Sequence, residues 1–105
     1  MNNRPKRVKV GVLNYNVDYV QKVDEDDSLG ECDYTGQAIK IKENQPFESE
    51  RDAMLHEFFH AVDHMQETNL TEKQVNRMAT GILMLLRDNP KFVKYLCEKH
   101  KVIKG

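Results

Sequence analysis

The chain has 105 residues, enough for one domain, residues 1–105, with a modest hydrophobic core. Hydrophobic residues make up 39% and charged residues 31%, which is globular composition and neither disordered nor membrane-embedded. The 16 basic and 17 acidic side chains give a net charge of −1, so neither nucleic acid nor a membrane is expected as a partner. Cys32 and Cys97 match no cysteine framework, and the chain has no apolar signal-peptide segment. We therefore expect reduced thiols in a cytoplasmic protein.

The first half of the chain predicts a small, mostly antiparallel sheet made of two hairpins, over residues 7–43. In the first hairpin, Gly11 interrupts an alternation of apolar residues, where a tight turn would separate a short strand from a longer one. The acidic run 24–27 is typical of a loop. The second predicted hairpin joins residues 29–34 to residues 37–42 through a turn that contains glycine.

The second half predicts three helices, which together with the sheet give an α+β fold. Ser49 with Asp52 three residues later is a start signal for the first helix. Thr71 with Gln74 starts the second in the same way, and Pro90 suits the first position of the third. The expected helices span about 50–66, 72–87 and 90–99.

His56, Glu57 and His60 form the pattern HExxH in the middle of the first expected helix. Residues four apart on a helix differ by about 40° around the axis and about 6 Å along it, so both imidazoles lie on one face. Both can then bind one zinc ion at about 2.0–2.1 Å. Glu57 is turned by about 100° and can act on water at the metal. The alternative is two surface histidines on an amphipathic helix, although a shuffled chain contains this pattern only about once in a hundred.

A catalytic zinc site uses three protein ligands and leaves one position for water. His64 and Asp63 lie about 12 and 10 Å along the helix axis from His56, too far to share one ion with it. The predicted third ligand is Glu72, in the first turn of the next helix, where the helix dipole favours a carboxylate. A surface carboxylate matched to that dipole is the alternative. Asn76 is either an exposed residue or a partner that holds a ligand in place.

The pattern His56-Glu57-x-x-His60 followed by Glu72-x-x-Val75-Asn76-x-x-Ala79 resembles the Glu-zincins in minimal form. It is especially similar to the ImmA/IrrE-type metallopeptidases, whose ligand helix carries E-x-x-A-N-x-F-A, with Val75 and Met78 here in place of the Ala and Phe. The wider layout resembles small phage- or prophage-encoded HExxH proteins. The segments that carry this likeness are Leu29-Gly30-Glu31, Asp33-Tyr34, Ala38 to Lys42, Leu55-His56-Glu57 and Asp88-Asn89-Pro90.

The resemblance implies a zincin-like fold, one Zn²⁺ per chain and peptide hydrolysis, in the host cytoplasm if the protein is phage-encoded. Zinc would lower the pKa of its bound water to about 7. Glu57 would take a proton from that water and pass it to the leaving amine. By analogy with zincins, strand 37–42 is expected at the cleft edge, where a peptide or protein substrate would pair with it. An ordinary edge strand protected by Lys40 and Lys42 is the alternative.

Four residues are candidates for stabilising the oxyanion of the reaction: Tyr34, Tyr95, His64 and His100. Two other functions stay open. The first is a metal-binding phage regulatory or interaction protein with little turnover, although a structural site has no use for a non-ligand carboxylate such as Glu57. The second is a nucleic-acid-associated phage factor that uses the basic cluster of residues 4–9, although the near-neutral charge disfavours it. The sequence carries no indication of an oligomeric state.

Overall fold

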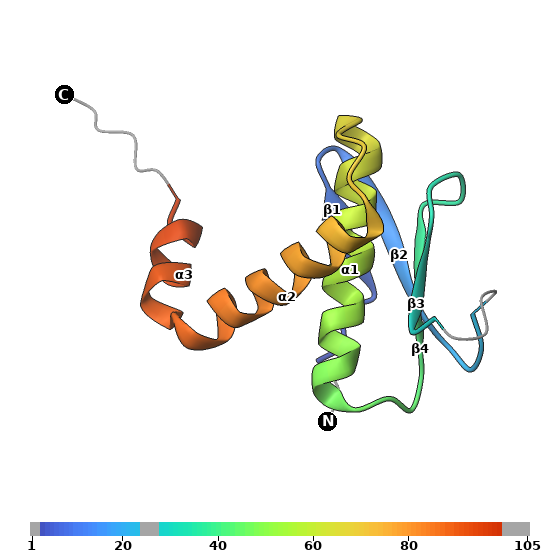
Figure 1. The fold of residues 1–105 in the computed structure, drawn as a ribbon, viewed down its shortest axis with the longest axis horizontal. Coiled ribbons are helices and arrows are strands. Elements are labelled where there is room, and N and C mark those ends of the chain that lie inside the picture. The colour runs from blue at the N-terminus through green and yellow to red at the C-terminus, as the bar shows by residue number, and fades with distance from the viewer. Residues whose placement is uncertain (1–2, 24–27, 100–105) are drawn as a thin grey trace.

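The computed structural model describes residues 3–23 and 28–99, in which a four-stranded sheet is followed by three helices (Figure 1). The strands are β1 (Arg7–Val10), β2 (Leu13–Val20), β3 (Gly30–Asp33) and β4 (Ala38–Lys42). The helices are α1 (Phe47–Gln66), α2 (Glu72–Asp88) and α3 (Pro90–Cys97). The predicted α+β fold class is confirmed. The expected loop at 24–27 lies outside the described residues.

The sheet is mixed, with the strand order β1-β2-β4-β3. Both predicted hairpins form, because β1 pairs with β2 and β3 pairs with β4, each in antiparallel orientation. The turn of the first hairpin contains Gly11, whose φ of 62° is a left-handed conformation that glycine adopts without strain. The central pair, β2 with β4, is parallel and sets Val17 opposite Ile39 and Tyr19 opposite Ile41.

This strand order contradicts one prediction. Residues 37–42 were expected at the edge of the sheet, but β4 has a partner strand on each side. The physical reason is apolar content, since Ile39 and Ile41 are fully buried and belong at the centre of the sheet. The edge strand on this side is β3, whose residues are all only half-buried and include Glu31 and Asp33. The strand at the other edge is β1. On the β3 side of the sheet, β3 and not β4 therefore has an edge available for main-chain pairing.

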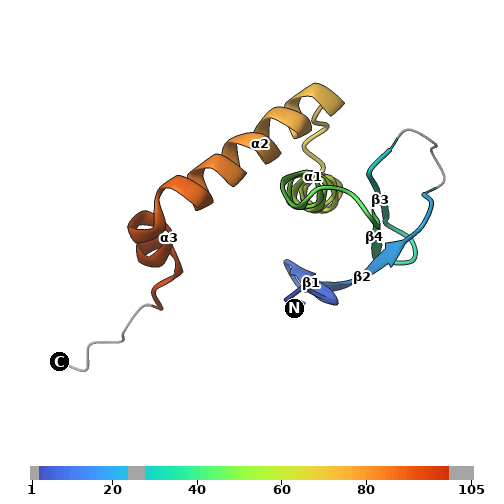
Figure 2. The same cartoon turned by 90° about the horizontal axis from the view of Figure 1, so that it is seen from below.

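The hydrophobic core lies between α1 and one face of the sheet (Figure 2). Alternate strand residues supply the sheet side, and they are Val10, Tyr15, Val17, Ile39 and Ile41. Ala53 and Ala61 supply the helix side, and their small side chains let α1 lie close to the strands. The buried ridge of α1 also contains Glu57, midway between the two alanines. The core thus brings the HExxH helix directly against the sheet.

α1 begins at Phe47, three residues before the predicted start. Its N-cap is Pro46, which makes no side-chain cap hydrogen bond, so the Ser49 start signal did not mark the boundary. Instead, the Ser49 hydroxyl hydrogen-bonds the side chain of Gln45, with Oγ 2.6 Å from Oε1. The helix reaches Gln66 as expected.

α2 begins where the sequence predicts, with a complete capping box. Thr71 Oγ1 accepts from the Gln74 N–H at 3.1 Å, and Gln74 Oε1 accepts from the Thr71 N–H at 2.8 Å. The first half of α2 packs on α1 through the fully buried Val75 and Ala79. Beyond that contact α2 leads away to α3, which packs on α2 alone among the described elements (Figures 1 and 2). In the described part of the chain, no helix combines the length and apolarity needed to cross a membrane.

Candidate metal centre

Two histidines one turn apart on α1 present their Nε2 atoms to the same point in space. The Nε2 atoms of His56 and His60 are 3.0 Å apart, and the ring planes are inclined by 72°. The two side chains are only 15% and 19% exposed. Helical spacing alone therefore brings two imidazole donors together.

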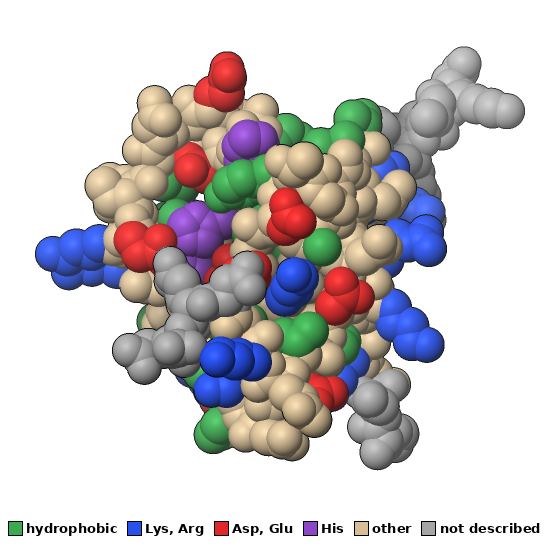
Figure 3. Space-filling model, turned by 90° about the vertical axis from the view of Figure 1, so that its right-hand side faces the viewer, with side chains coloured by type: hydrophobic (Ala, Val, Ile, Leu, Met, Phe, Trp, Pro, Cys, Tyr) green, Lys and Arg blue, Asp and Glu red, His purple; other side chains and the backbone are tan. Residues whose placement is uncertain are grey.

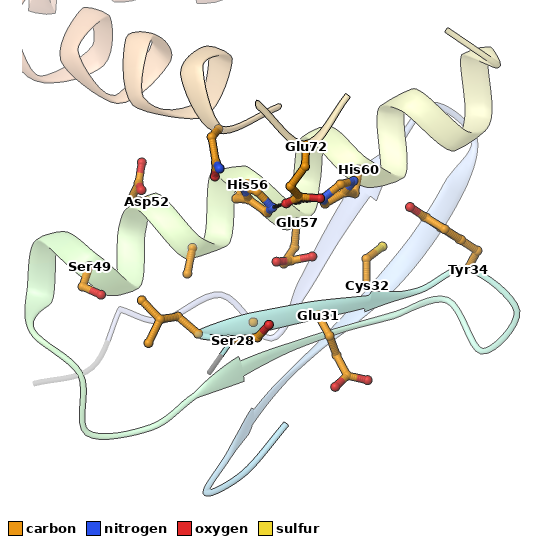
Figure 4. A pocket seen from close by; sticks show the side chains of 14 residues that line it. Ser28, Glu31, Cys32, Tyr34, Ser49, Asp52, His56, Glu57, His60 and Glu72 are labelled. Atoms are coloured by element: carbon orange, nitrogen blue, oxygen red, sulfur yellow. Dashed lines mark hydrogen bonds and ion pairs between the residues drawn. The ribbon is translucent and has the colours of Figure 1, made fainter. Parts of the chain in front are cut away.

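Glu72, the first residue of α2, adds a carboxylate to this pair (Figure 4). Its Oε1 atom lies 2.5 Å from His56 Nε2, and its Oε2 atom lies 3.2 Å from His60 Nε2. The Glu72 side chain is 65% exposed, so one side of the group is open to solvent. The three residues predicted as ligands are thus brought together, from two different helices.

The loop between α1 and α2 places Glu72, and Asp63 organises that loop. Asp63 Oδ1 accepts hydrogen bonds from the Thr68 hydroxyl at 2.5 Å and from the Leu70 N–H at 2.9 Å. These two bonds, led by the Leu70 N–H, lower the pKa of Asp63. Glu67 adopts a left-handed φ of 55°, which ends α1 and turns the chain. Asp63 is thus a loop-forming residue, consistent with its exclusion as a ligand.

The donor set fits zinc. Around a tetrahedral ion with ligands at about 2.0–2.1 Å, donor atoms lie about 3.3 Å apart. The Nε2 atoms and the carboxylate oxygens that face each other are 2.5 to 3.3 Å apart. All three donors lie within 4.8 Å of one another. Two imidazoles and one carboxylate form a donor set that catalytic zinc sites use, with a fourth position left for water.

The group lines an open cleft of about 650 Å³ between α1, β3 and the start of α2 (Figure 4). Glu57 lines the same cleft, points from α1 toward β3 and is only 5% exposed. Glu57 is not one of the three grouped donors. A carboxylate beside a metal group, but outside its donor set, has the position that a general base requires.

Sequence analysis missed the contribution of β3 to this cleft, where Gly30 and Cys32 lie opposite α1. Burial, and then the charge of Glu57, raises the pKa of the Cys32 thiol to about 12. Cys32 is therefore a neutral thiol at pH 7, and it is not one of the three grouped donors. Asn76 lines the cleft from α2 and is exposed, so both alternatives for this residue stay open. A prediction from the sequence that β3 lies at this edge of the sheet would have identified these cleft residues.

Arg4, one residue of the N-terminal basic cluster, is in contact with side chains of the folded domain. Its guanidinium forms an ion pair with Glu50 at 2.5 Å and lies 4.6 Å from the centroid of the Tyr19 ring. Figure 3 shows histidine side chains at the surface with acidic side chains nearby, and basic side chains dispersed over the rest of that face. Among the described residues on this face, the basic side chains do not form a continuous stripe of the kind that tracks a phosphate backbone.

In comparisons with known proteins, no family model matches the chain, and no curated protein or solved structure matches it. The residues of the cleft and their geometry are therefore the basis for inferring a function.

Proposed function

We propose that this chain is a zinc-dependent metallopeptidase that hydrolyses peptide bonds in a peptide or protein substrate. His56, His60 and Glu72 hold one Zn²⁺, and Glu57 is the general base. The observation that carries the proposal is the convergence of these three donors beside a buried, non-ligand carboxylate in an open cleft. The order of the elements also supports it, because an HExxH helix is followed by a helix that begins with the glutamate.

The residues of the chain have distinct roles in this proposal. Zinc, when bound, polarises the scissile carbonyl and makes a water acidic enough to ionise near neutral pH. Glu57 accepts the proton of the attacking water and then donates it to the leaving amine. The position of Glu57, held between α1 and β3, limits the movement of its carboxylate, so the base is already oriented before substrate arrives.

The substrate is proposed to lie along β3. This strand has β4 as its one partner among the described strands, so its other edge is available for pairing. Gly30, Glu31 and Cys32 of β3 also line the cleft that contains the histidines. An extended peptide added at this edge would pass beside the metal group with its main chain hydrogen-bonded.

The likeness to ImmA/IrrE-type metallopeptidases stays a proposal on the same residues. Val75, which stands where that pattern has Ala, is fully buried in the contact between α1 and α2. Its larger side chain changes the packing of that contact, while Glu72 still reaches both histidines. The composition and the two free cysteines among the described residues support a cytoplasmic setting, that of the host if the protein is phage-encoded.

A second candidate function is a metal-binding regulatory or interaction protein with little turnover. One observation favours it, because the part of the molecule formed by α3 and the end of α2 has large apolar side chains on its surface. They are Met84, Leu86, Phe92, Tyr95 and Leu96, each at least 43% exposed. Exposed apolar residues in a group are typical of protein-binding surfaces. The two functions differ in turnover, which the following experiment measures.

The experiment combines metal analysis with digestion of a peptide library. Wild-type protein is expected to bind about one zinc per chain and to cleave library peptides. His56→Ala and His60→Ala are expected to lose both properties, because two ligands alone form an incomplete site. His64→Ala is the matched control for zinc content, since His64 lies on the same helix outside the donor group. Full zinc retention in His56→Ala and His60→Ala would refute the metallopeptidase proposal, and zinc binding without any cleavage would favour the second function.

A further inference from the structure

A tyrosine just after β3 reaches into the cleft from the side opposite the histidine helix. Tyr34 lines the cleft together with His56, His60 and Glu57. Figure 4 shows its side chain rising from the end of β3 toward α1, with the hydroxyl on the side of His60. Sequence analysis left Tyr34 as one of four possible oxyanion donors, and the structure distinguishes among them.

The ring of Tyr34 is held by His64. The two rings stack in parallel, with centroids 4.1 Å apart and planes inclined by 5°. His64 is one helical turn beyond His60 on α1, so the helix that carries the two metal ligands also carries this support. A tyrosine side chain has only two torsions between backbone and ring, so a stacked ring fixes the position of its oxygen.

The other candidates among the described residues lack this placement. Tyr95 is on α3, is 68% exposed and is not part of the cleft lining. His100 lies outside the described residues. His64 is itself not among the lining residues and is the support for Tyr34. Ser49, a hydroxyl that does line the cleft, hydrogen-bonds Gln45 and lies two turns of α1 before His56.

The chemistry requires a hydrogen-bond donor at this position. When water adds to a peptide carbonyl, negative charge develops on the carbonyl oxygen, and a donor at about 2.7–3.1 Å from that oxygen stabilises it. Burial, followed by the negative charges around it, raises the pKa of Tyr34 to about 12. Its hydroxyl therefore keeps its proton throughout the neutral range and remains a donor.

We propose that Tyr34 is a catalytic residue of the proposed hydrolysis, donating a hydrogen bond from its hydroxyl to the developing oxyanion, and that His64 is the positioning residue that holds its ring. This inference rests on the proposed peptidase function. In this inference, the residue that follows β3 stabilises the oxyanion, and Glu57 on α1 acts as the general base.

The test uses zinc-loaded protein and Tyr34→Phe, which keeps the stacked ring and removes the hydroxyl. Zinc content and KM for a cleaved library peptide are expected to stay at wild-type values. Removal of one oxyanion donor is expected to lower kcat by about 10²–10³-fold. A second readout needs no turnover: affinity for an N-phosphoryl-leucyl dipeptide, a tetrahedral mimic, is expected to fall at least about tenfold, because the same donor contacts its phosphoryl oxygen. Tyr95→Phe is the matched control and is expected to change none of these values.

The role of His64 is tested by His64→Ala and His64→Phe. The alanine variant is expected to lower kcat with zinc content unchanged, and the phenylalanine variant is expected to restore kcat because it restores a stacking partner. Wild-type kcat and wild-type affinity for the phosphoryl dipeptide in Tyr34→Phe would overturn the inference and leave the proposed peptidase intact. Loss of zinc from Tyr34→Phe would also overturn it, because the role would then be structural. A wild-type protein that binds zinc but neither cleaves peptides nor binds the phosphoryl dipeptide would overturn both proposals.

Discussion

A Cβ atom on Gly30 would lie 3.1 Å from Cγ of Glu57 and 3.3 Å from its Oε2 atom. The same Cβ atom would meet the main-chain oxygen of Lys40 at 3.2 Å, so the strand cannot easily move aside. The absence of a side chain at Gly30 therefore makes the space that Glu57 occupies between α1 and β3. The edge strand β3 and the candidate general base Glu57 fit together only because β3 has a glycine at position 30.

Gly30→Ala is expected to displace the Glu57 carboxylate. The added methyl group overpacks the contact, which costs on the order of 1 kcal/mol or more in stability. The short contacts require Glu57 to shift by a few tenths of an ångström. A shift of about 1 Å in a catalytic group lowers turnover by about 10²-fold, so kcat should fall by less than about 10²-fold while zinc content stays at the wild-type level. Steady-state kinetics, metal analysis and denaturant unfolding measure the three effects.

Gly81→Ala is the matched control for that change. A Cβ atom on Gly81, within α2, would meet nothing within 4 Å. The substitution is expected to raise stability by about 0.5–1 kcal/mol, because alanine favours a helix over glycine, and to leave kcat unchanged. Equal kcat values for Gly30→Ala and wild type would contradict the proposed contact between Gly30 and the base.

Glu57→Gln separates the base from the ligands. The amide keeps the shape of the side chain and cannot accept the proton of water, so kcat is expected to fall by about 10²–10⁴-fold. Zinc content should stay near one per chain, because Glu57 is outside the donor group. If Glu57→Gln loses zinc while Glu72→Ala retains it, the two glutamates have been assigned in the wrong order.

Glu72→Ala is expected to reduce the stabilisation that zinc gives the folded protein. A ligand that binds only the native state raises the unfolding free energy by about 4 kcal/mol at 1,000 times its Kd, and a weaker site gains less at the same zinc concentration. Without zinc, the loss should be only a few tenths to about 1 kcal/mol, typical of a carboxylate at a helix N-terminus. Melting curves with and without zinc measure both quantities. Lys73→Ala, at the next exposed position, is the control and should behave as wild type. If zinc stabilises Glu72→Ala as much as it stabilises the wild type, the third ligand lies elsewhere.

Asp63→Asn is expected to loosen the loop that carries Glu72. The folded-state pKa of Asp63 is lowered by the Leu70 N–H and the Thr68 hydroxyl. A lowered pKa means that the stabilisation is fully present above the unfolded value of about 3.9 and is lost as the pH falls through the folded value. Wild type should thus be more stable than Asp63→Asn at neutral pH, with a difference that shrinks below about pH 4. Unfolding curves across that range measure it, and a difference independent of pH would assign the effect to geometry and not to charge.

The parts of the site that follow from local sequence were predictable. The placement of His56 and His60 on one face depends only on helical spacing, and the start of α2 at Glu72 follows from the adjacent capping box. The class of fold was also predictable, since the alternation of apolar residues changes period after Pro46.

The parts that depend on pairing between distant segments were not predictable. The alternation of Ile39 and Ile41 indicates that one face of this strand is buried, but it does not indicate that β2 is the neighbouring strand, because that pairing depends on how the two hairpins pack together under α1. The close contact of Gly30 with Glu57 and the stacking of Tyr34 on His64 likewise require the position of β3, which no local pattern encodes.

The parallel pairing of β2 with β4 has a consequence for how the chain folds. Each hairpin closes over a few residues, and hairpins form in about 1–10 μs. The contact between Val17 and Ile39 joins segments that are far apart in the chain, and forming it costs loop-closure entropy. This cost arises before α1 can cover all four strands. Joining the two hairpins is therefore expected to be the slow step of folding. Until it is complete, β4 would still have a free edge, and Tyr15 and Val17 of β2 would not be part of the core beneath α1.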